Sequence, residues 1–345
     1  MMEKLMPKQD SLLLAAFQGT NDRVPVWLMR QAGRFLPEYR AIKTEHSLQQ
    51  MFQTPEIAAE VTCLPVPILG VDAAILFSDI LTLPSQMGFD IKFTNESGPV
   101  ISNPLKSSAD FEKVHDFKNL SFVAETIKTA NQMLPKHVPL IGFAGAPFTV
   151  LSYLVEGGSS VNFAGVFNLM AEKPEQFHGL LKTLTKNTID YLNLQKEVGI
   201  KAFQLFDTWG GILRPADYAH FVLPYLKEIF ARVDLPSIYY LKNCSHLLAL
   251  MEKSGADFLS VCHTVVLGHN SVLAKTEKGI QGNLFNGLLY ADEETLKKEV
   301  SDILIGARNY KRYIFNLSHG LFPDMEVKKV KFVVDTVHRF DWVNR

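Results

Sequence analysis

Two arginines stand four residues apart in an early loop of the sequence. Arg30 and Arg34 flank Gly33 in the run Met-Arg-Gln-Ala-Gly-Arg, which follows a short apolar stretch. Guanidinium groups are planar, forked donors that suit carboxylates or phosphates. At this spacing both could fall on one side of a turn, and a glycine lets the backbone approach a ligand closely. The pattern indicates an anion-binding site, although each arginine could equally pair with a nearby Asp or Glu.

A single carboxylate follows another apolar run. The sequence reads Ala-Ala-Ile-Leu-Phe before Ser78 and Asp79, and Ile-Leu after them. A carboxylate among apolar neighbours is costly unless it has a partner. Asp79 therefore either caps the next helix or meets a ligand that is cationic or carries N–H groups.

Three more hydrogen-bonding side chains come at the ends of apolar runs. Tyr153 follows a stretch rich in small residues, Thr208 follows Phe206 and Asp207, and His319 lies in the run Asn-Leu-Ser-His-Gly. A tyrosine hydroxyl can orient a ligand, and a histidine can bond a carboxylate or move a proton. Ordinary packing of Tyr153 and a purely structural role for His319 are the alternatives.

The elements that must position these side chains alternate regularly along the chain. Short β-rich runs are separated by longer segments with helical periodicity. The expected strands are residues 25–29, 73–77, 139–143, 201–206, 237–241, 257–261, 279–284 and 313–317. The expected helices are residues 54–69, 120–134, 174–198, 215–233, 246–253, 292–307 and 323–340.

This alternation predicts a parallel sheet, and eight strands are the number that closes a barrel filled by side chains. We therefore predict an α/β fold in which residues 1–345 form a single (β/α)8 TIM-type barrel domain. Its active site is expected at the C-terminal ends of the strands. An open doubly wound sheet is the alternative, but the dinucleotide fingerprint GxGxxG is missing after the first expected strand.

Two segments lie outside the repeating pattern. A short capped helix, beginning after Asp10 or Ser11 and ending at Gly19, is expected as an N-terminal helical extension outside the barrel. The segment 83–120 is polar and rich in proline and glycine, which predicts a hairpin or a flap.

Composition excludes several classes of protein. The 345 residues carry 35 Lys and Arg against 36 Asp and Glu, a formal net charge of -1, without a long basic block. This argues against nucleic-acid partners and against a polybasic membrane signal. No apolar run approaches the roughly 18 residues of a membrane span, and residues 1–10 lack the layout of a signal peptide. The three cysteines lack CxxC spacing, so we expect a cytoplasmic protein with reduced thiols.

Five runs together resemble the uroporphyrinogen decarboxylase family. They are MRQAGRFLPEYR at 29–40, FSDIL at 77–81, GFAGAPFTVLSYLVEGG at 142–158, QLFDTWGG at 204–211 and NLSHG at 316–320. The first and third are long and unusual, and the resemblance spans essentially the whole chain. It implies a (β/α)8 barrel, a cytoplasmic homodimer and a role in tetrapyrrole (haem) biosynthesis. The implied reaction converts uroporphyrinogen III to coproporphyrinogen III plus four CO2, without a metal or an organic cofactor.

The resemblance also implies roles for individual residues. Asp79, Arg30 and Arg34 would be catalytic, with the arginines holding carboxylates and Asp79 binding the pyrrole N–H groups at the centre of the macrocycle. Tyr153, Thr208 and His319 would contact carboxylate arms. The implied substrate-binding residues are Arg30, Gln31, Ala32, Gly33, Arg34, Asp79, Tyr153, Phe206, Thr208 and His319. Phe206 would pack on the face of the substrate.

Departures from the family pattern lie on the fifth to seventh expected strands. Val-Cys-His at 261–263 stands where the family usually has Leu-Asp-Trp, and Asn-Leu-Phe-Asn at 283–286 replaces Asn-Leu-Asp-Pro. The run Lys-Asn-Cys-Ser-His at 242–246 replaces a glycine-rich turn. The shape of this side of the site is therefore left open.

Two other functions compete with this interpretation. A zinc-dependent thiol methyltransferase of the same barrel superfamily would use ligands such as Cys244, His246, Cys262 and His263. In that case the arginine-rich first motif would lack a purpose. A non-catalytic tetrapyrrole carrier is the second alternative, and the presence of Asp79 argues against it.

Overall fold

The computed structural model describes residues 11–94, 98–112 and 114–342. Some predictions lie outside the described residues. They are the helix cap at Asp10, the statement that residues 1–10 do not form a signal peptide, and the last three residues of the expected domain. Within these ranges, none of the helices has the length and apolar character that crossing a membrane requires.

The centre of the structure is a curled parallel sheet of seven strands, ordered β1-β4-β5-β6-β7-β8-β9. Every neighbouring pair in it is parallel, and almost all of its residues are buried. The strands are β1 (Ala74–Ile75), β4 (Leu140–Gly145), β5 (Ala202–Asp207), β6 (Ser237–Leu241), β7 (Phe258–Ser260), β8 (Gly279–Gln281) and β9 (Tyr313–Ile314). The predicted parallel α/β arrangement is confirmed, since each of these strands falls in an expected position or overlaps it.

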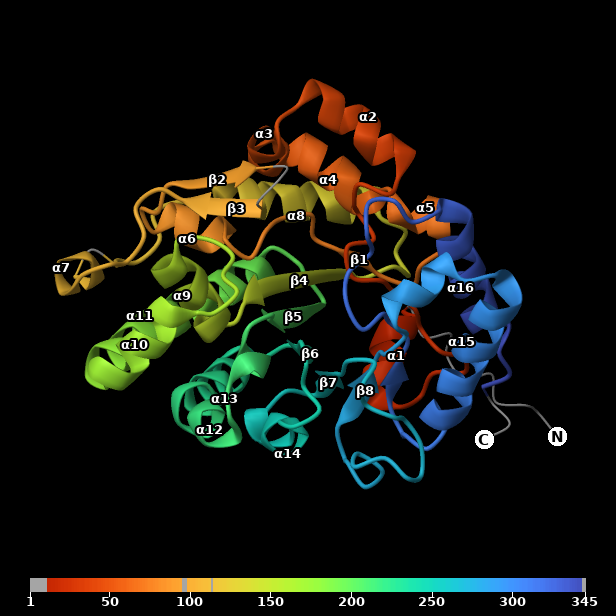
Figure 1. Cartoon of the computed structure of the whole chain (residues 1–345). Coiled ribbons are helices and arrows are strands. Elements are labelled where there is room, and N and C mark those ends of the chain that lie inside the picture. The colour runs from red at the N-terminus through yellow and green to blue at the C-terminus, as the bar shows by residue number, and fades with distance from the viewer. Residues whose placement is uncertain (1–10, 95–97, 113, 343–345) are drawn as a thin grey trace.

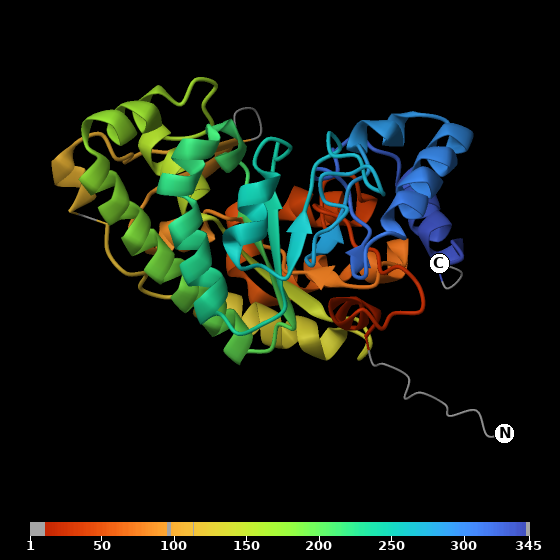
Figure 2. The ribbon, with the colours of Figure 1, turned by 90° about the horizontal axis from the view of Figure 1, so that it is seen from below.

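Helices surround the sheet (Figure 1). Seen from below, α10 and α11 lie at one flank and α15 and α16 at the other, with the strands between them (Figure 2). The α-helices are α1 (Leu12–Gln18), α2 (Pro37–Glu45), α3 (Leu48–Gln53), α4 (Pro55–Cys63), α5 (Pro65–Leu69), α6 (Thr82–Gln86), α7 (Ser108–Phe111), α8 (Ser121–Met133), α9 (Pro147–Glu156), α10 (Ala164–Glu172), α11 (Pro174–Glu197), α12 (Pro215–Phe221), α13 (Leu223–Arg232), α14 (Leu248–Met251), α15 (Glu293–Ala307) and α16 (Val327–Arg339). Short 3-10 helices are η1 (Gly210–Ile212), η2 (Glu252–Ser254) and η3 (Asn286–Tyr290).

Prolines account for two differences from the predicted helices. The expected helix 54–69 is two helices, α4 and α5, with Pro65 at the first position of the second. The expected helix 215–233 divides into α12 and α13, and Pro224 lies in the first turn of α13. Proline has no N–H and clashes with the preceding turn, so it begins a helix well and does not continue one.

The prediction of a strand at 25–29 is wrong. Only Val26 of this segment pairs like a strand residue, in a single bridge to Phe315. Two backbone N–H groups of the segment donate to side chains and not to the backbone of a neighbouring strand. Val26 N–H donates to Asp72 Oδ2 at 2.9 Å, and Met29 N–H donates to Asn316 Oδ1 at 3.0 Å. The segment nonetheless has backbone hydrogen bonds to the residues next to β1 and β9. Asp72 N–H donates to Val26 O at 2.8 Å, and Phe315 N–H donates to Pro25 O at 2.9 Å.

The capped N-terminal helix is present as α1. Ser11 Oγ accepts the Leu14 N–H at 3.3 Å, and Gly19 ends the helix in the left-handed region at φ 69. The side chains of Leu13 and Ala16 are fully buried, and the Phe17 ring lies 4.6 Å from that of Phe258. The helix is therefore packed against the strands through its apolar face.

The turn-rich segment 83–120 contains the predicted hairpin. Strands β2 (Ile91–Thr94) and β3 (Gly98–Ile101) pair antiparallel, on the side of the molecule that carries α3 and α6 (Figure 1). Ile101 N–H donates to Gly157 O at 2.9 Å, which ties the hairpin to the end of α9. Residues 95–97 and 113 of this segment lie outside the description.

Candidate active site

Arg30 begins a tight turn after the segment that carries Val26. Its φ of 62 is left-handed, and a side chain at Gly33 would meet Arg30 O at 2.7 Å. Gln31 is fully buried and fastens this turn to β1, because its Nε2 donates to Ala73 O at 3.0 Å. Its Oε1 accepts the Leu28 N–H at 2.9 Å. The side chain of Gln31 thus supports the loop, and only its backbone remains to face a ligand.

The stem of Arg30 lies over the backbone that follows His319. A side chain at Gly320 would overlap Cγ and Cδ of Arg30. His319 is half-buried, and its Nδ1 lies 3.1 Å from the Tyr240 hydroxyl. Burial, Arg30 and Lys242 together lower the pKa of His319 to about 4. The imidazole is therefore neutral near pH 7.

Asp79 follows β1 and begins the turn into α6. Its Oδ1 accepts the Leu81 N–H at 2.8 Å, and its own N–H donates to Thr82 Oγ1 at 3.2 Å. Burial raises the pKa of Asp79, while the Leu81 N–H and the charge of Arg30 act against that rise. Among the hydrogen bonds of the described residues, none reaches Oδ2. Asp79 thus has a cap-like bond on one oxygen and a second oxygen free for a ligand.

Tyr153 and Phe206 line the same end of the sheet. Burial and the negative charge of Asp79 raise the pKa of Tyr153, and Arg30 acts in the opposite direction. The Tyr153 ring lies 5.9 Å from that of Trp209. Phe206, near the end of β5, packs edge-on against Tyr240 at 5.6 Å. Both side chains are half-buried and therefore reach the surface.

Arg34 and Thr208 are the remaining predicted side chains. Arg34 is exposed, and its charge lowers the pKa of Lys43 and opposes the burial-driven rise at Tyr39, both in α2. Thr208 is half-buried just beyond β5. Electrostatics thus links Arg30 with Asp79, Tyr153 and His319, while the charge of Arg34 acts on two residues of α2. Ala32, between the two arginines, is half-buried.

Residues that sequence reasoning left without a role also reach this end of the sheet. The hydroxyl of Tyr240, in β6, is hydrogen-bonded to Nδ1 of His319. Lys242 directly follows the same strand. Lys242 is half-buried, with its Nζ 5.5 Å from the centroid of the Trp209 ring. The signal that could have identified both is position, because functional side chains of such folds stand at the C-terminal ends of strands.

Asp207, a polar residue of the same rim, is a support for the fold. It is fully buried and accepts hydrogen bonds from Thr149 Oγ1 at 2.6 Å, the Tyr239 hydroxyl at 2.8 Å and Gly210 N–H at 3.0 Å. Burial raises its pKa against the effect of these donors. The carboxyl group is saturated by the protein and is not exposed to a ligand.

The four zinc-type side chains do not converge on one point. Cys244 Sγ and Cys262 Sγ lie 3.5 Å apart, but His246 Nε2 bonds to Leu213 O at 2.9 Å. His263 Nδ1 lies 3.2 Å from Ser318 Oγ. Across the described part of the chain, no three His, Cys, Asp or Glu side chains are grouped in a way that could hold a metal ion. The cluster that a zinc-dependent methyltransferase would need is therefore not assembled.

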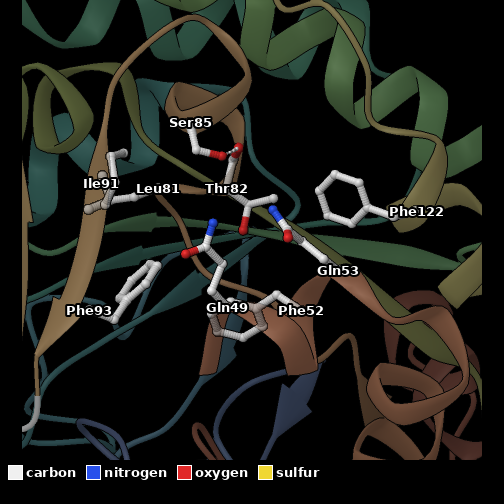
Figure 3. Close-up of a pocket in the computed structure, with 9 residues that line it drawn as sticks. All are labelled: Gln49, Phe52, Gln53, Leu81, Thr82, Ser85, Ile91, Phe93 and Phe122. Carbon is white, nitrogen blue, oxygen red and sulfur yellow. Dashed lines mark hydrogen bonds between the residues drawn. The ribbon is translucent and has the colours of Figure 1, made fainter. Parts of the chain in front are cut away.

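A pocket lies beside the segment that follows Asp79, between α3, α6, β2 and α8 (Figure 3). Gln49, Gln53 and Thr82 contribute polar groups to it, and the side chains of Phe52 and Phe93 form part of its wall. None of its lining residues is ionisable. It offers no group for acid–base chemistry or for binding an anion by charge.

Comparison with known proteins adds a family and several relatives. Residues 7–340 match the sequence profile described as Uroporphyrinogen decarboxylase (URO-D). A protein named uroporphyrinogen decarboxylase from Trichlorobacter lovleyi is 42% identical over 92% of this chain and 95% of its own length. One of the same name from Thermodesulfovibrio yellowstonii is 43% identical over 93% of this chain and 95% of its own.

Solved structures show the same fold at low identity. A methyltransferase from Methanosarcina mazei superposes with a TM-score of 0.79 at 20% identity, over 94% of this chain and 96% of its own. A B12-independent methionine synthase from Shewanella sp. gives a TM-score of 0.56 at 10% identity, over 82% and 86% of the two chains. At these identities the likeness concerns the fold alone.

Proposed function

The chain belongs to the uroporphyrinogen decarboxylase family, and from this premise we propose that it converts uroporphyrinogen III to coproporphyrinogen III and four CO2. It acts as a carboxy-lyase in tetrapyrrole (haem) biosynthesis. The observation that carries the proposal is the match at 42–43% identity over more than nine-tenths of the chain. The positive charge of Arg30, which acts on the buried carboxyl of Asp79, supports it, because the substrate is a polycarboxylate with N–H donors at its centre.

The reaction needs a place for the electron pair that CO2 leaves behind. Protonation of the ring carbon next to an acetate arm makes the pyrrole cationic. Loss of CO2 then passes the electron pair into the ring and leaves an exocyclic methylene carbon. A proton adds to this carbon to give a methyl group, and the ring carbon gives back its own proton, which restores the pyrrole. Each cycle consumes one proton and releases one CO2, so the ring of the substrate is its own electron sink.

Asp79 is proposed to stabilise the cationic ring. Its free Oδ2 would accept the pyrrole N–H groups, and its negative charge would act most strongly when the ring becomes positive. At an effective dielectric constant near 20, a unit charge about 4 Å away contributes on the order of 4 kcal/mol. This is a useful part of an enzymatic reduction of the barrier.

The other proposed site residues bind and orient the substrate. Arg30 and Arg34 would hold carboxylate arms, and the backbone of 31–33 would approach the same arms from the turn. Tyr153, Thr208 and His319 would donate hydrogen bonds to these carboxylates, and Phe206 would pack against the macrocycle. Because the pKa of His319 is about 4, we assign it to hydrogen bonding and not to supplying the proton.

We also propose that the whole chain is one domain and that its sheet closes as an eight-membered barrel. The segment around Val26 would be the eighth member. Support comes from its backbone hydrogen bonds to Asp72 on one side and to Phe315 on the other. In this proposal α1 is the N-terminal extension, packed against the outer part of the barrel.

A homodimer in the cytoplasm completes the proposal. The loop after β7 exposes Val266 and Val272 by 74% and 80%, and Phe285 is 46% exposed. Exposed apolar side chains on neighbouring loops are typical of a surface that another copy covers. The cytoplasm suits the free thiols of Cys244 and Cys262, which lie close together without a bond. Sedimentation of the purified protein gives the oligomeric state directly.

The test of the reaction is anaerobic incubation of metal-analysed protein with uroporphyrinogen III, followed by oxidation and chromatography of the porphyrins. We expect products with seven, six, five and finally four carboxyl groups. Tight substrate binding without any product would make the chain a carrier. Absence of binding together with stoichiometric zinc would instead support the methyltransferase.

A further inference from the structure

Lys242 is a half-buried cation at the end of β6, next to the group formed by Arg30, Asp79, Tyr153 and His319. Its ammonium group lies over the Trp209 ring, 5.5 Å from the centroid. Among the ion pairs of the described residues, none involves Lys242. A half-buried ammonium group without a carboxylate partner is available to the negative charge of a ligand.

The backbone around Lys242 is held closely in place. A side chain at Gly211 would overlap the carbonyl oxygen of Lys242, so the loop after β5 packs directly on this residue. Lys242 N–H donates to Asp207 O at 3.3 Å. The ammonium group is therefore carried by a backbone that two strands position, and this suits a binding group better than a freely moving surface lysine.

Lys242 and Arg30 act on the same imidazole from two different elements. Both positive charges lower the pKa of His319, although Arg30 lies in the first loop and Lys242 follows β6. The ring of His319 is stacked with that of Tyr240 in β6, with ring planes 5° from parallel. Two cations thus face one neutral hydrogen-bonding group across the C-terminal end of the sheet.

We propose that Lys242 binds a carboxylate arm of the substrate, as a cationic anchor additional to the two arginines. The inference rests on the proposed function, because it takes the substrate to be a macrocycle with acidic arms. Asp79 would hold the centre of that macrocycle, Arg30 one arm, and Lys242 an arm that extends toward β6 and Trp209. A pyrrole macrocycle carries acetate and propionate arms, and both present the same carboxylate to the lysine.

The test compares Lys242→Met, which keeps the apolar stem, with Lys242→Arg, which keeps the charge. Lys201→Met is the matched control, because Lys201 is exposed at the opposite, N-terminal end of β5. KM and kcat for uroporphyrinogen III are measured anaerobically, and the equilibrium Kd is measured with uroporphyrin III, the oxidised macrocycle, which keeps the eight carboxylates and is not decarboxylated. We expect Lys242→Met to raise Kd and KM about tenfold, Lys242→Arg to stay within about threefold, and Lys201→Met to match the parent.

Partly decarboxylated substrates identify the arm. If Lys242 holds an acetate, the increase in KM disappears for at least one of the seven-, six- and five-carboxyl intermediates. If it holds a propionate, the increase persists for all of them. Unchanged Kd and KM in Lys242→Met would overturn the inference. Because Kd is read without turnover, a parent protein that binds but does not react would contradict the proposed function and still report on Lys242.

A second measurement guards against loss of structure. The His319 resonance titrates with a pKa that we expect to rise above about 4 in Lys242→Met, since one of the two opposing cations is gone. Lys242→Arg should leave that pKa close to its parent value. A rise in KM in Lys242→Met with the pKa of His319 unchanged would indicate that the variant perturbs the site elsewhere, and the assignment of Lys242 would fall.

Discussion

The carboxylate of Asp79 shows how a single residue can serve a reaction at the expense of stability. Burial raises its pKa in the folded chain, against the Leu81 N–H and Arg30. The folded state therefore binds the proton of this group more tightly than the unfolded state. The proton bound to Asp79 therefore stabilises the folded state when the pH is below about 3.9, the ordinary pKa of an aspartate. This stabilisation is lost as the pH rises through the pKa of Asp79 in the folded chain.

We therefore predict opposite effects of Asp79→Asn on stability and activity. The amide keeps an oxygen for the Leu81 N–H and removes the buried charge, so the melting temperature should rise by a few degrees at pH 7.5. Decarboxylation should fall at least about a hundredfold, because the cationic ring loses its counter-charge. Thermal unfolding and product chromatography measure the two effects.

Two more substitutions at Asp79 separate charge from shape. Asp79→Ala should remove most of the decarboxylation, and Asp79→Glu should leave part of it, since the charge survives at a shifted position. Normal turnover in Asp79→Ala would contradict the mechanism. A lower melting temperature in Asp79→Asn would show that interaction with Arg30 outweighs the cost of burying the carboxylate.

His319 gives a prediction about pH. Its pKa is about 4 in the folded chain, against about 6.5 for a free histidine. The unfolded chain binds this proton more readily, so the neutral imidazole favours folding above pH 6.5, and the contribution is lost as the pH falls toward 4. His319→Gln should therefore reduce the loss of stability between pH 7 and 4.5 by up to about 3 kcal/mol. Denaturant unfolding at the two pH values measures it.

The control for that titration is a histidine on the surface. His269 is exposed, and His269→Gln is the reference for the substitution of histidine by glutamine itself. If His319→Gln behaves like His269→Gln, then the imidazole of His319 is already protonated near pH 6, and its assignment as a neutral hydrogen-bonding group is wrong.

At the scale of elements, regular strands were predictable and the special conformations were not. Buried apolar runs predicted the seven strands of the main sheet, and β6 has the predicted bounds. The segment around Val26 was predicted as a strand because its pattern is apolar, whereas Asp72 and Asn316 take up its N–H groups from far along the sequence. The turn at Arg30 depends on a left-handed φ that arginine seldom adopts. No sequence pattern therefore indicated this conformation.

The contact between two loops predicts the effect of a glycine. Gly320→Ala would place a methyl group where the stem of Arg30 lies, and the guanidinium group would have to move. We expect KM for uroporphyrinogen III to rise by about threefold to tenfold, in the direction of Arg30→Ala, which should weaken binding and turnover together. The folded state should lose less than about 2 kcal/mol, because the displaced Arg30 is exposed.

Gly179→Ala provides the comparison. Gly179 lies in α11 with no neighbour near the added methyl group, so alanine should leave KM unchanged and stabilise the helix by up to about 1 kcal/mol. Steady-state kinetics and thermal melts of both variants are sufficient. Unchanged KM in Gly320→Ala would mean that Arg30 reaches the same carboxylate from another rotamer. The contact between the new methyl group and the stem of Arg30 would then have no effect on substrate binding.

The charge of the whole molecule determines how a polyanionic substrate is attracted. With 35 cationic and 36 acidic residues, the chain has no net field that would draw in a substrate with eight carboxylates. Attraction must come from the few cations at the C-terminal end of the sheet. Arg30 is exposed and Lys242 half-buried, so salt should screen the first more than the second. Each decarboxylation also removes a charge, which weakens binding as the reaction proceeds toward product.

We therefore predict that KM for uroporphyrinogen III rises severalfold between about 0.05 and 0.5 M ionic strength, where the Debye length falls below about 5 Å, while kcat changes much less. The affinity for coproporphyrinogen III, with half the carboxylates, should depend less steeply on salt, and this is measured by inhibition. Because cations near the site cause the dependence of KM on ionic strength, Lys242→Met should make this dependence weaker, whereas Lys201→Met should leave it unchanged. A KM independent of salt for the parent would show that apolar contacts with the macrocycle, and not charge, dominate binding.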